Sequence, residues 1–294
     1  MSKKERLFFG SGTAIITPFK DGGVDYIALG NLIERQLLNS TDAIIVLGTT
    51  GEAPTIYEKE RCEIITFAKK VINGSCPLIV GTGSNATSVA IRYTKNAQDL
   101  GADGCLVVSP YYNKASAKGL MLHYRAIAEC VKIPIIMYNV PSRTGMNIPM
   151  EVYEDLKSVD NITGVKEAGG SLSYTTELIS KYKDFFHIYT GCDELTLSTL
   201  ALGGCGVISV VSNLLPSHMH RLCAEFSQGN VLKAQELQLY LSPLIKEMFS
   251  EVNPIPVKTA LAKMGLCTDE LRLPLCQSQR SKEIARVLKD YGLL

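Results

Sequence analysis

Short apolar runs alternate along this chain with longer segments in which apolar residues recur every three or four positions. Runs of four to seven residues bounded by Gly, Pro or Asn are typical of buried strands. We expect strands at residues 12–16, 43–47, 77–80, 105–108, 135–138, 162–168, 187–190 and 206–210. Helices are expected at residues 25–39, 55–73, 86–100, 117–131, 172–183 and 214–229, with shorter ones after Pro149 and before Gly203. A capping box at residues 55–58 is expected to open the second helix.

The repeat of strand and helix predicts the fold class. Continuously apolar strands separated by helices indicate a parallel sheet covered by helices. Eight such units close naturally into a (β/α)₈ TIM barrel, here over residues 1–229. An open doubly wound sheet is the alternative. Residues 230–294 lack strand signals and predict three helices, near 230–250, 256–265 and 279–291, as a C-terminal segment packed on the barrel.

Composition narrows the class of protein. The chain has 294 residues, 46% of them hydrophobic, and a net charge of +1, so no basic face for nucleic acid is expected. No apolar run is long enough to span a bilayer, and the charged N-terminus leads into no signal-peptide segment. The nine cysteines fit no zinc-binding spacing, so we expect no metal and reduced, mostly core-packed thiols in a cytoplasmic protein.

Lys166 is the first candidate for chemistry, because it lies at the C-terminal end of an expected buried strand. Burial disfavours an ammonium group and favours the neutral amine. A neutral amine in a dry pocket attacks ketones and forms a Schiff base. The alternative is a strand-end lysine whose charged head reaches solvent.

The other strand ends add to this picture, because active sites of such barrels lie at the C-terminal ends of the strands. Hydroxyls, phenols and a guanidinium gather there, which suits Schiff-base chemistry on a ketone that carries a carboxylate. The residues are Thr49, Thr50, Tyr111, Tyr112, Tyr138, Arg143, Lys166, Gly191 and Ile208.

Four motifs carry a resemblance that covers essentially the whole chain. They are Gly-Thr-Thr-Gly-Glu at 48–52, Pro-Tyr-Tyr-Asn at 110–113, Tyr-Asn-Val-Pro-Ser-Arg-Thr-Gly at 138–145 and Gly-Val-Lys-Glu-Ala at 164–168. In this order they resemble the pyruvate-dependent class I aldolase family, which includes N-acetylneuraminate lyase and the dihydrodipicolinate synthases. The arginine in the third motif favours the dipicolinate branch.

The resemblance implies a reaction and an assembly. Lys166 is expected to condense with pyruvate, and the resulting enamine to attack L-aspartate 4-semialdehyde, giving 4-hydroxy-tetrahydrodipicolinate for diaminopimelate and lysine biosynthesis. No separate cofactor is implied, because the Schiff base between pyruvate and Lys166 serves as the electron acceptor of the reaction. A homotetramer built as a dimer of dimers is expected.

The same resemblance implies roles for individual residues. Tyr138 would be the general acid and base, and Thr49 and Tyr112 the other members of a proton relay, with Tyr112 reaching into a neighbouring subunit. The pyruvate carboxylate is expected on Thr50, the semialdehyde carboxylate on Arg143, and the pocket lining at Gly191 and Ile208. The alternative is that the tyrosines pack the rim, Arg143 lies in a solvated turn and Thr49 and Thr50 form an ordinary strand-to-helix turn.

Feedback inhibition by L-lysine is expected to be weak or absent. Lysine-sensitive relatives often have histidines on the helix after the Thr-Thr motif and a glutamate after the third-strand loop. This chain has Glu58 and Arg61 on that helix, and Val89 after residues 85–87. A cationic ligand would lose a carboxylate partner and meet Arg61.

Three other readings remain open. Residues 81–86 match G-x-G-x-x-G/A between a strand and a helix, with Asp103 about twenty residues on, which is the fingerprint of a dinucleotide-binding oxidoreductase. A second possibility is another 4-hydroxy-2-oxo acid aldolase of the same family, because pocket shape sets the choice of aldehyde. The third is a non-catalytic member that binds pyruvate.

Overall fold

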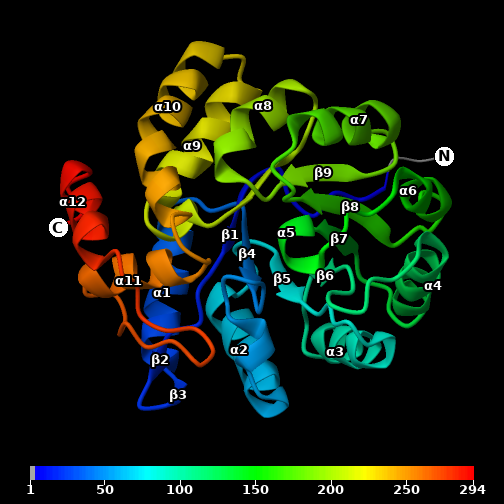
Figure 1. Ribbon diagram of the computed structural model, residues 1–294, viewed down its shortest axis with the longest axis horizontal. Helices are drawn as coiled ribbons and strands as arrows, with labels where there is room; N and C mark the ends of the chain where they lie inside the picture. Colours follow the sequence, from blue (N-terminus) through cyan, green and yellow to red (C-terminus); the bar gives the residue numbers. More distant parts are fainter. Residues whose placement is uncertain (1–3) are drawn as a thin grey trace.

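A computed structural model describes residues 4–294 and shows a closed barrel of eight parallel strands (Figure 1). The strands are hydrogen-bonded in the order β1-β10-β9-β8-β7-β6-β5-β4, with β1 paired to both β10 and β4. The predicted (β/α)₈ barrel is confirmed and the open sheet is excluded. The bounds are β1 Gly10–Ala14, β4 Ala43–Val46, β5 Leu78–Gly81, β6 Gly104–Val108, β7 Ile135–Asn139, β8 Ile162–Glu167, β9 His187–Thr190 and β10 Gly206–Ser209.

Helices cover the outside of this barrel, and they follow the apolar spacing of the sequence. In α1, for example, Leu29, Leu32 and Ile33 are buried on the side that faces the strands. Asp25 begins that helix by accepting a hydrogen bond from the backbone of Ala28. The helices around the barrel are α1 Tyr26–Leu38, α2 Glu58–Ile72, α3 Thr87–Asp99, α4 Ala117–Ala128, α5 Pro141–Thr144, α6 Met150–Leu156, α7 Leu172–Tyr182, α8 Thr196–Ala201 and α9 Pro216–Ser227.

Two local features differ from the expectation. The capping box at residues 55–58 was wrong, because the chain makes an extra turn (η1, Ala53–Thr55) and α2 begins only at Glu58. There the Glu60 carboxylate accepts the backbone N–H of Tyr57 at 3.0 Å. A small hairpin, β2 Phe19–Lys20 with β3 Gly23–Val24, was not predicted, because two-residue strands have no period to detect.

The barrel interior is a packed core that closes one end. Phe8, Ile45, Leu106 and Ile136 are buried inside it, in one cluster with Tyr189. The Phe8 and Tyr189 rings stack at 4.4 Å, and the Tyr189 hydroxyl donates to the Phe8 carbonyl. Tyr138 of β7 and Lys166 of β8 are paired in the strand register. They lie at the C-terminal ends of these strands, and Tyr138 is part of the same apolar cluster.

Three further helices follow the barrel, α10 Val231–Met248, α11 Ile255–Lys263 and α12 Ser281–Asp290, as expected for residues 230–294. Figure 1 shows α10 beside α9, with α12 at the outer edge. Lys258 of α11 is fully buried and donates to Glu52, in the loop after β4, at 2.5 Å. The boundary at residues 229 and 230 remains a prediction, but this contact shows that the segment reaches the strand-end loops.

The described residues also bear on membrane and thiol expectations. Across residues 4–294, no helix has both the length and the apolar character of a membrane span. No disulfide joins the nine cysteines, all of which lie within the described residues, and Cys105 and Cys223 are buried. Four more, Cys76, Cys130, Cys205 and Cys267, are partly buried and pack against the core, so the expectation that most thiols pack there is confirmed. Cys276 is exposed.

Candidate active site

Lys166 lies inside the C-terminal end of the barrel. Its side chain is only 6% exposed, so the alternative in which its head reaches bulk solvent does not hold. The Nζ atom lies 4.5 Å from the centre of the Tyr138 ring on the neighbouring strand. Tyr138 itself is 5% exposed. The structure thus places an amine and a phenol side by side, out of bulk water.

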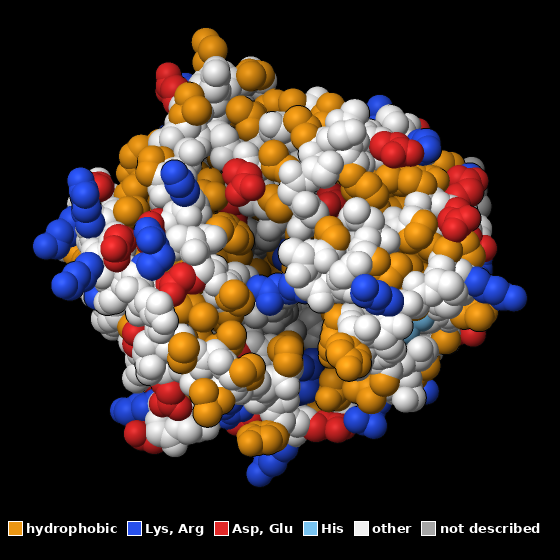
Figure 2. All heavy atoms as spheres, in the orientation of Figure 1, with side chains coloured by type: hydrophobic (Ala, Val, Ile, Leu, Met, Phe, Trp, Pro, Cys, Tyr) orange, Lys and Arg blue, Asp and Glu red, His pale blue; other side chains and the backbone are white. Residues whose placement is uncertain are grey.

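Both side chains line a cavity of about 390 Å³ that opens towards the loops after the strands. In the space-filling view, the molecule is hollowed near the centre of the face shown (Figure 2). Thr49, Thr50, Arg143 and Gly191 line the same cavity. Six of the eight predicted site residues therefore come together around one space, from four different strand ends.

Gly191 is needed there for a steric reason. A Cβ atom at this position would lie 2.6 Å from Cε of Lys166 and 2.7 Å from Cβ of Ala168. Any larger residue would therefore displace the amine. The next residue, Cys192, also lines the cavity, but burial raises the pKa of its thiol to about 12. Lys166 therefore has no thiolate competitor at this position.

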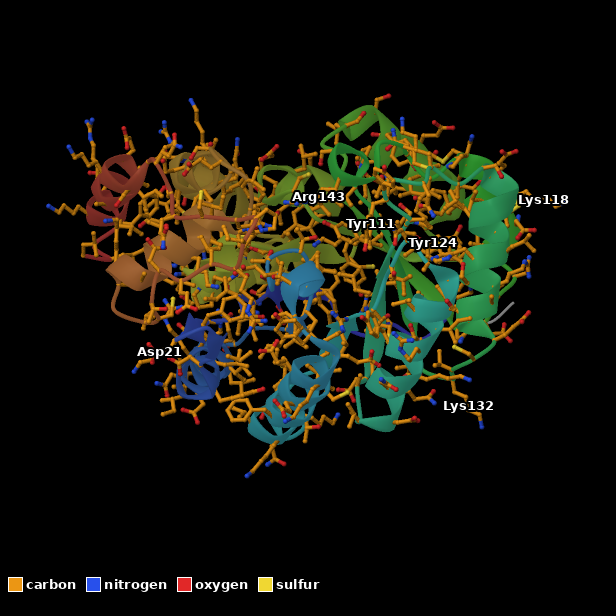
Figure 3. All side chains as sticks on the ribbon, turned by 60° about the horizontal axis from the view of Figure 1, so that its bottom comes forward. Asp21, Tyr111, Lys118, Tyr124, Lys132 and Arg143 are labelled. Carbon is orange, nitrogen blue, oxygen red and sulfur yellow. The ribbon has the colours of Figure 1, made fainter. Side chains whose placement is uncertain are left out.

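Two predicted site residues lie outside the cavity. Ile208 is fully buried in the barrel core, and Val210 lines the cavity instead. Tyr112 is 91% exposed and has a φ of +72°, a strained conformation for a tyrosine. Its neighbour Tyr111 lines a second cavity together with Arg143. Figure 3 shows Tyr111 and Arg143 at the same end of the barrel. A single chain does not bring Tyr112 to its own Lys166.

Asn253 is a site residue that the sequence did not reveal. It lines both cavities, from the segment that follows the barrel. Its side-chain amide donates to the Thr50 hydroxyl at 3.0 Å, and its backbone carbonyl accepts from Arg143 at 2.9 Å. Asn253 thereby fixes the two side chains on which carboxylates were expected. No local pattern marked it, because Thr50 is 203 residues away in the sequence.

Asp193 was also missed, and it supports the floor of the cavity. It is fully buried and accepts hydrogen bonds from the Ser209 hydroxyl and the Val210 backbone, which joins the ends of β9 and β10. Burial raises the pKa of this carboxyl to about 6, although Ser209 and the nearby Lys166 oppose the shift. A polar residue after a strand end was the only sequence signal available.

The second cavity, of about 430 Å³, adjoins the first and shares Thr49, Tyr138, Arg143 and Asn253 with it. Arg61 of α2 lines its far side and is 5% exposed. The outer helix α2 and the barrel strands thus enclose a space beyond the one that holds Lys166.

The dinucleotide fingerprint has a different explanation in the structure. A Cβ atom at Gly81 would lie 2.0 Å from the Leu47 carbonyl, and one at Gly83 would lie 2.4 Å from the Val108 nitrogen. These glycines allow neighbouring strands of the barrel to approach each other. The Asp103 carboxylate pairs with Lys69 at 2.9 Å and accepts the backbone N–H of Leu78. Among the described residues, it makes no hydrogen bond or ion pair with residues 81–86. The motif is therefore structural.

Comparison with known proteins points to the family that the four sequence motifs resemble. The sequence profile of the Dihydrodipicolinate synthetase family matches residues 7–290. A 4-hydroxy-tetrahydrodipicolinate synthase from Alkaliphilus oremlandii is 50% identical over 269 residues, covering 92% of this chain and 93% of that protein.

Solved structures agree. Dihydrodipicolinate synthase from Thermotoga maritima has a TM-score of 0.95 and 44% identity, covering 98% of this chain and all of that one. The chloride-inhibited enzyme from Acinetobacter baumannii, complexed with pyruvate, has a TM-score of 0.95 and 41% identity, with 97% and 99% covered. Together with a profile match over nearly the whole chain, these likenesses show that this protein belongs to the Dihydrodipicolinate synthetase family.

Proposed function

We propose that this protein is a lyase that condenses pyruvate with L-aspartate 4-semialdehyde to 4-hydroxy-tetrahydrodipicolinate, in diaminopimelate and lysine biosynthesis. One observation carries the proposal. The buried amine of Lys166 lies 4.5 Å from the Tyr138 ring, in a cavity that also holds Thr50 and Arg143. The family assignment supports it, because the curated relative from Alkaliphilus oremlandii is named for this reaction.

The reaction begins with the Lys166 amine. Its nitrogen attacks the keto carbon of pyruvate, and the oxygen leaves as water to give an iminium. Loss of a methyl proton then forms an enamine, because the iminium accepts the electron pair of the broken C–H bond. Lys166 is the only covalent group that this step needs, and no separate cofactor enters the scheme.

The enamine carbon next attacks the aldehyde carbon of the semialdehyde and forms the new C–C bond. The amino group of the semialdehyde then attacks the former keto carbon and closes the ring. The C–N bond to Lys166 breaks, which returns the free amine. The net change is loss of one water from the two substrates.

Binding groups hold each substrate in line for these steps. We assign the pyruvate carboxylate to Thr50, whose hydroxyl is already oriented by Asn253. We assign the semialdehyde carboxylate to Arg143, whose planar guanidinium matches a carboxylate fork. Gly191 leaves the space for the Lys166 side chain, and Ile208 supports the floor from inside the barrel. Positioning of this kind removes much of the entropic barrier to a two-substrate reaction.

Proton transfer is assigned to Tyr138, relayed through Thr49 and the partner subunit's copy of Tyr112. Tyr138 and Thr49 line the Lys166 cavity, whereas Tyr112 does not line it and is exposed. An exposed aromatic ring on a strained backbone needs a compensating contact, and a neighbouring copy of the chain would supply it. The relay therefore requires at least a dimer, and we propose the tetramer built as a dimer of dimers, in the cytoplasm. Residues 1–229 would be its catalytic barrel and residues 230–294 its appended helical segment.

Replacing Tyr112 by Phe should lower turnover about 10²-fold, because a relay hydroxyl contributes on the scale of general acid–base catalysis. Steady-state kinetics of Tyr112→Phe measures this, with Tyr57→Phe as a control that removes another exposed phenol, 73% exposed, outside the relay. An unchanged rate for Tyr112→Phe would remove Tyr112 from the relay.

L-Lysine should inhibit this enzyme weakly or not at all. The Arg61 guanidinium lies buried beside the second cavity, and Val89 on the same wall offers no carboxylate to an ammonium group. A cationic amino acid would meet a like charge there. The measurement is initial rate against L-lysine concentration at saturating substrates. Half-inhibition at low or sub-millimolar L-lysine would contradict this.

A coupled assay tests the proposed reaction directly. The protein is supplied with pyruvate and L-aspartate 4-semialdehyde, and the heterocycle is detected by a reductase that consumes it. Turnover with this aldehyde should exceed turnover with other short aldehydes, because Arg143, which lines the cavity, is the proposed partner of its carboxylate. Faster reaction with a different aldehyde would instead establish another 4-hydroxy-2-oxo acid aldolase of the family.

A further inference from the structure

Glu194 is an exposed carboxylate on the wall of the cavity that holds Lys166. It lies in a short turn (η2, Asp193–Leu195) that follows Gly191, after the end of β9. Across residues 4–294, the Glu194 carboxylate takes part in no ion pair. A carboxylate that lines a ligand cavity without a cation of its own chain is suited to a cationic group on a ligand.

The backbone around Glu194 is fixed, so its side chain extends from a defined point on the cavity wall. The preceding residue, Asp193, is fully buried and accepts the Ser209 hydroxyl and the Val210 backbone N–H. The Asp193 backbone carbonyl accepts the Gln238 amide of α10 at 3.2 Å. These contacts tie the turn to the end of β10 on one side and to α10 on the other.

The other charged side chains of this cavity leave Glu194 as the available anion. Glu251 is engaged, because its carboxylate accepts the Ser278 hydroxyl and the backbone N–H of the next residue, the latter at 3.1 Å. The amine of Lys166 is reserved for pyruvate. Arg143 lines the cavity too, and no ion pair of the described chain joins it to Glu194. One positive and one negative group therefore border the same space.

The two substrates differ in the charges that they bring to this space. Pyruvate carries only a negative charge and has no N–H group, so it offers Glu194 no donor. L-Aspartate 4-semialdehyde carries an ammonium and a carboxylate on the same carbon. With the carboxylate on Arg143, the ammonium lies in the space that Glu194 also lines. Opposite charges attract most strongly where a cavity excludes bulk water.

We propose that Glu194 binds the ammonium group of the semialdehyde and thereby selects an α-amino aldehyde over aldehydes that lack the amino group. The inference rests on the proposed synthase reaction and names the contact that distinguishes its second substrate. A carboxylate accepts an N–H from an ammonium and from a neutral amine alike. The contact therefore persists when the nitrogen loses the proton that ring closure requires. A site that hydrogen-bonds a substrate N–H rejects the analogue that lacks it.

Two aldehydes that differ only in the amino group test this contact, L-aspartate 4-semialdehyde and succinate semialdehyde. The protein, in excess over labelled pyruvate, is mixed with each aldehyde and quenched with acid, and the rate at which label enters the C–C bonded product is measured. Glu194→Gln should raise the half-saturating concentration of aspartate semialdehyde at least about tenfold. The value for succinate semialdehyde, which is only negatively charged, should stay the same or fall.

Glu34→Gln is the matched control, because it makes the same exchange at an exposed position of α1, and it should leave both concentrations within twofold. Equal half-saturation by the two aldehydes in the unchanged protein overturns the proposal without any variant. So does an unchanged value for aspartate semialdehyde in Glu194→Gln, an equal rise for both aldehydes, or loss of the selectivity in Glu251→Gln instead. Label that enters product with neither aldehyde would reject the synthase reaction, and this assignment with it.

Discussion

Replacing Lys166 by Arg should abolish the synthase reaction, with turnover reduced by at least about 10³-fold. Arginine has a side chain of similar length, but its guanidinium stays protonated and cannot act as a nucleophile. The buried position beside Tyr138 would still be filled, so the fold should survive. Steady-state turnover with both substrates measures the effect, and far-ultraviolet circular dichroism checks the fold.

The matched control is Lys118→Arg, which makes the same exchange at an exposed position of α4. Its turnover should match that of the unchanged protein. If Lys166→Arg kept even a tenth of the activity, the amine of Lys166 would not be the group that forms the covalent intermediate.

Breaking the buried pair between Glu52 and Lys258 should have the largest effect on stability. Both side chains are almost fully buried, and Lys258 also lies 3.9 Å from the centre of the Phe19 ring. Lys258→Met would leave the Glu52 carboxylate buried with only the backbone of Arg272 as partner. Loss of one partner of a buried pair costs about 3–5 kcal/mol of unfolding free energy. Equilibrium unfolding in urea measures the change.

A double variant separates the charge from the packing. Glu52→Gln combined with Lys258→Met removes both charges, so it should be less destabilised than the sum of the two single variants. The exposed pair Lys181 and Glu177 is the control, and Lys181→Met should shift the unfolding midpoint little. If Lys258→Met shifted the unfolding midpoint as little as Lys181→Met does, the buried pair would not anchor the C-terminal segment.

Most strands were predictable because they are short apolar runs bounded by turn residues, although β1 begins two residues before the expected residues 12–16 and contains the polar Ser11 and Thr13. β8, for example, is buried at all six positions, including the polar Thr163, Lys166 and Glu167. Closure of the barrel was inferred from the number of units, and only coordinates show the pairing of β1 with β10. The start of α2 was misplaced, because Thr55 and Glu58 have the spacing of a capping box although the chain turns between them.

The candidate site was predictable where its residues follow strands, because parallel strands in a barrel bring their C-terminal ends together. Lys166, Tyr138 and Thr49 meet for that reason. Asn253 and Lys258 were not predictable, because they come from the segment after the barrel and their contacts span more than 200 residues. Tyr112 is a separate case, since the contact proposed for it lies outside a single chain.

Reduction of the protein with borohydride in the presence of pyruvate, followed by peptide mass mapping, tests the central claim most directly. The account predicts one reduced pyruvate adduct per chain, on Lys166, and none on Lys258, which is also buried. An adduct on another residue, or a protein left unmodified under conditions where it turns over substrate, would contradict it.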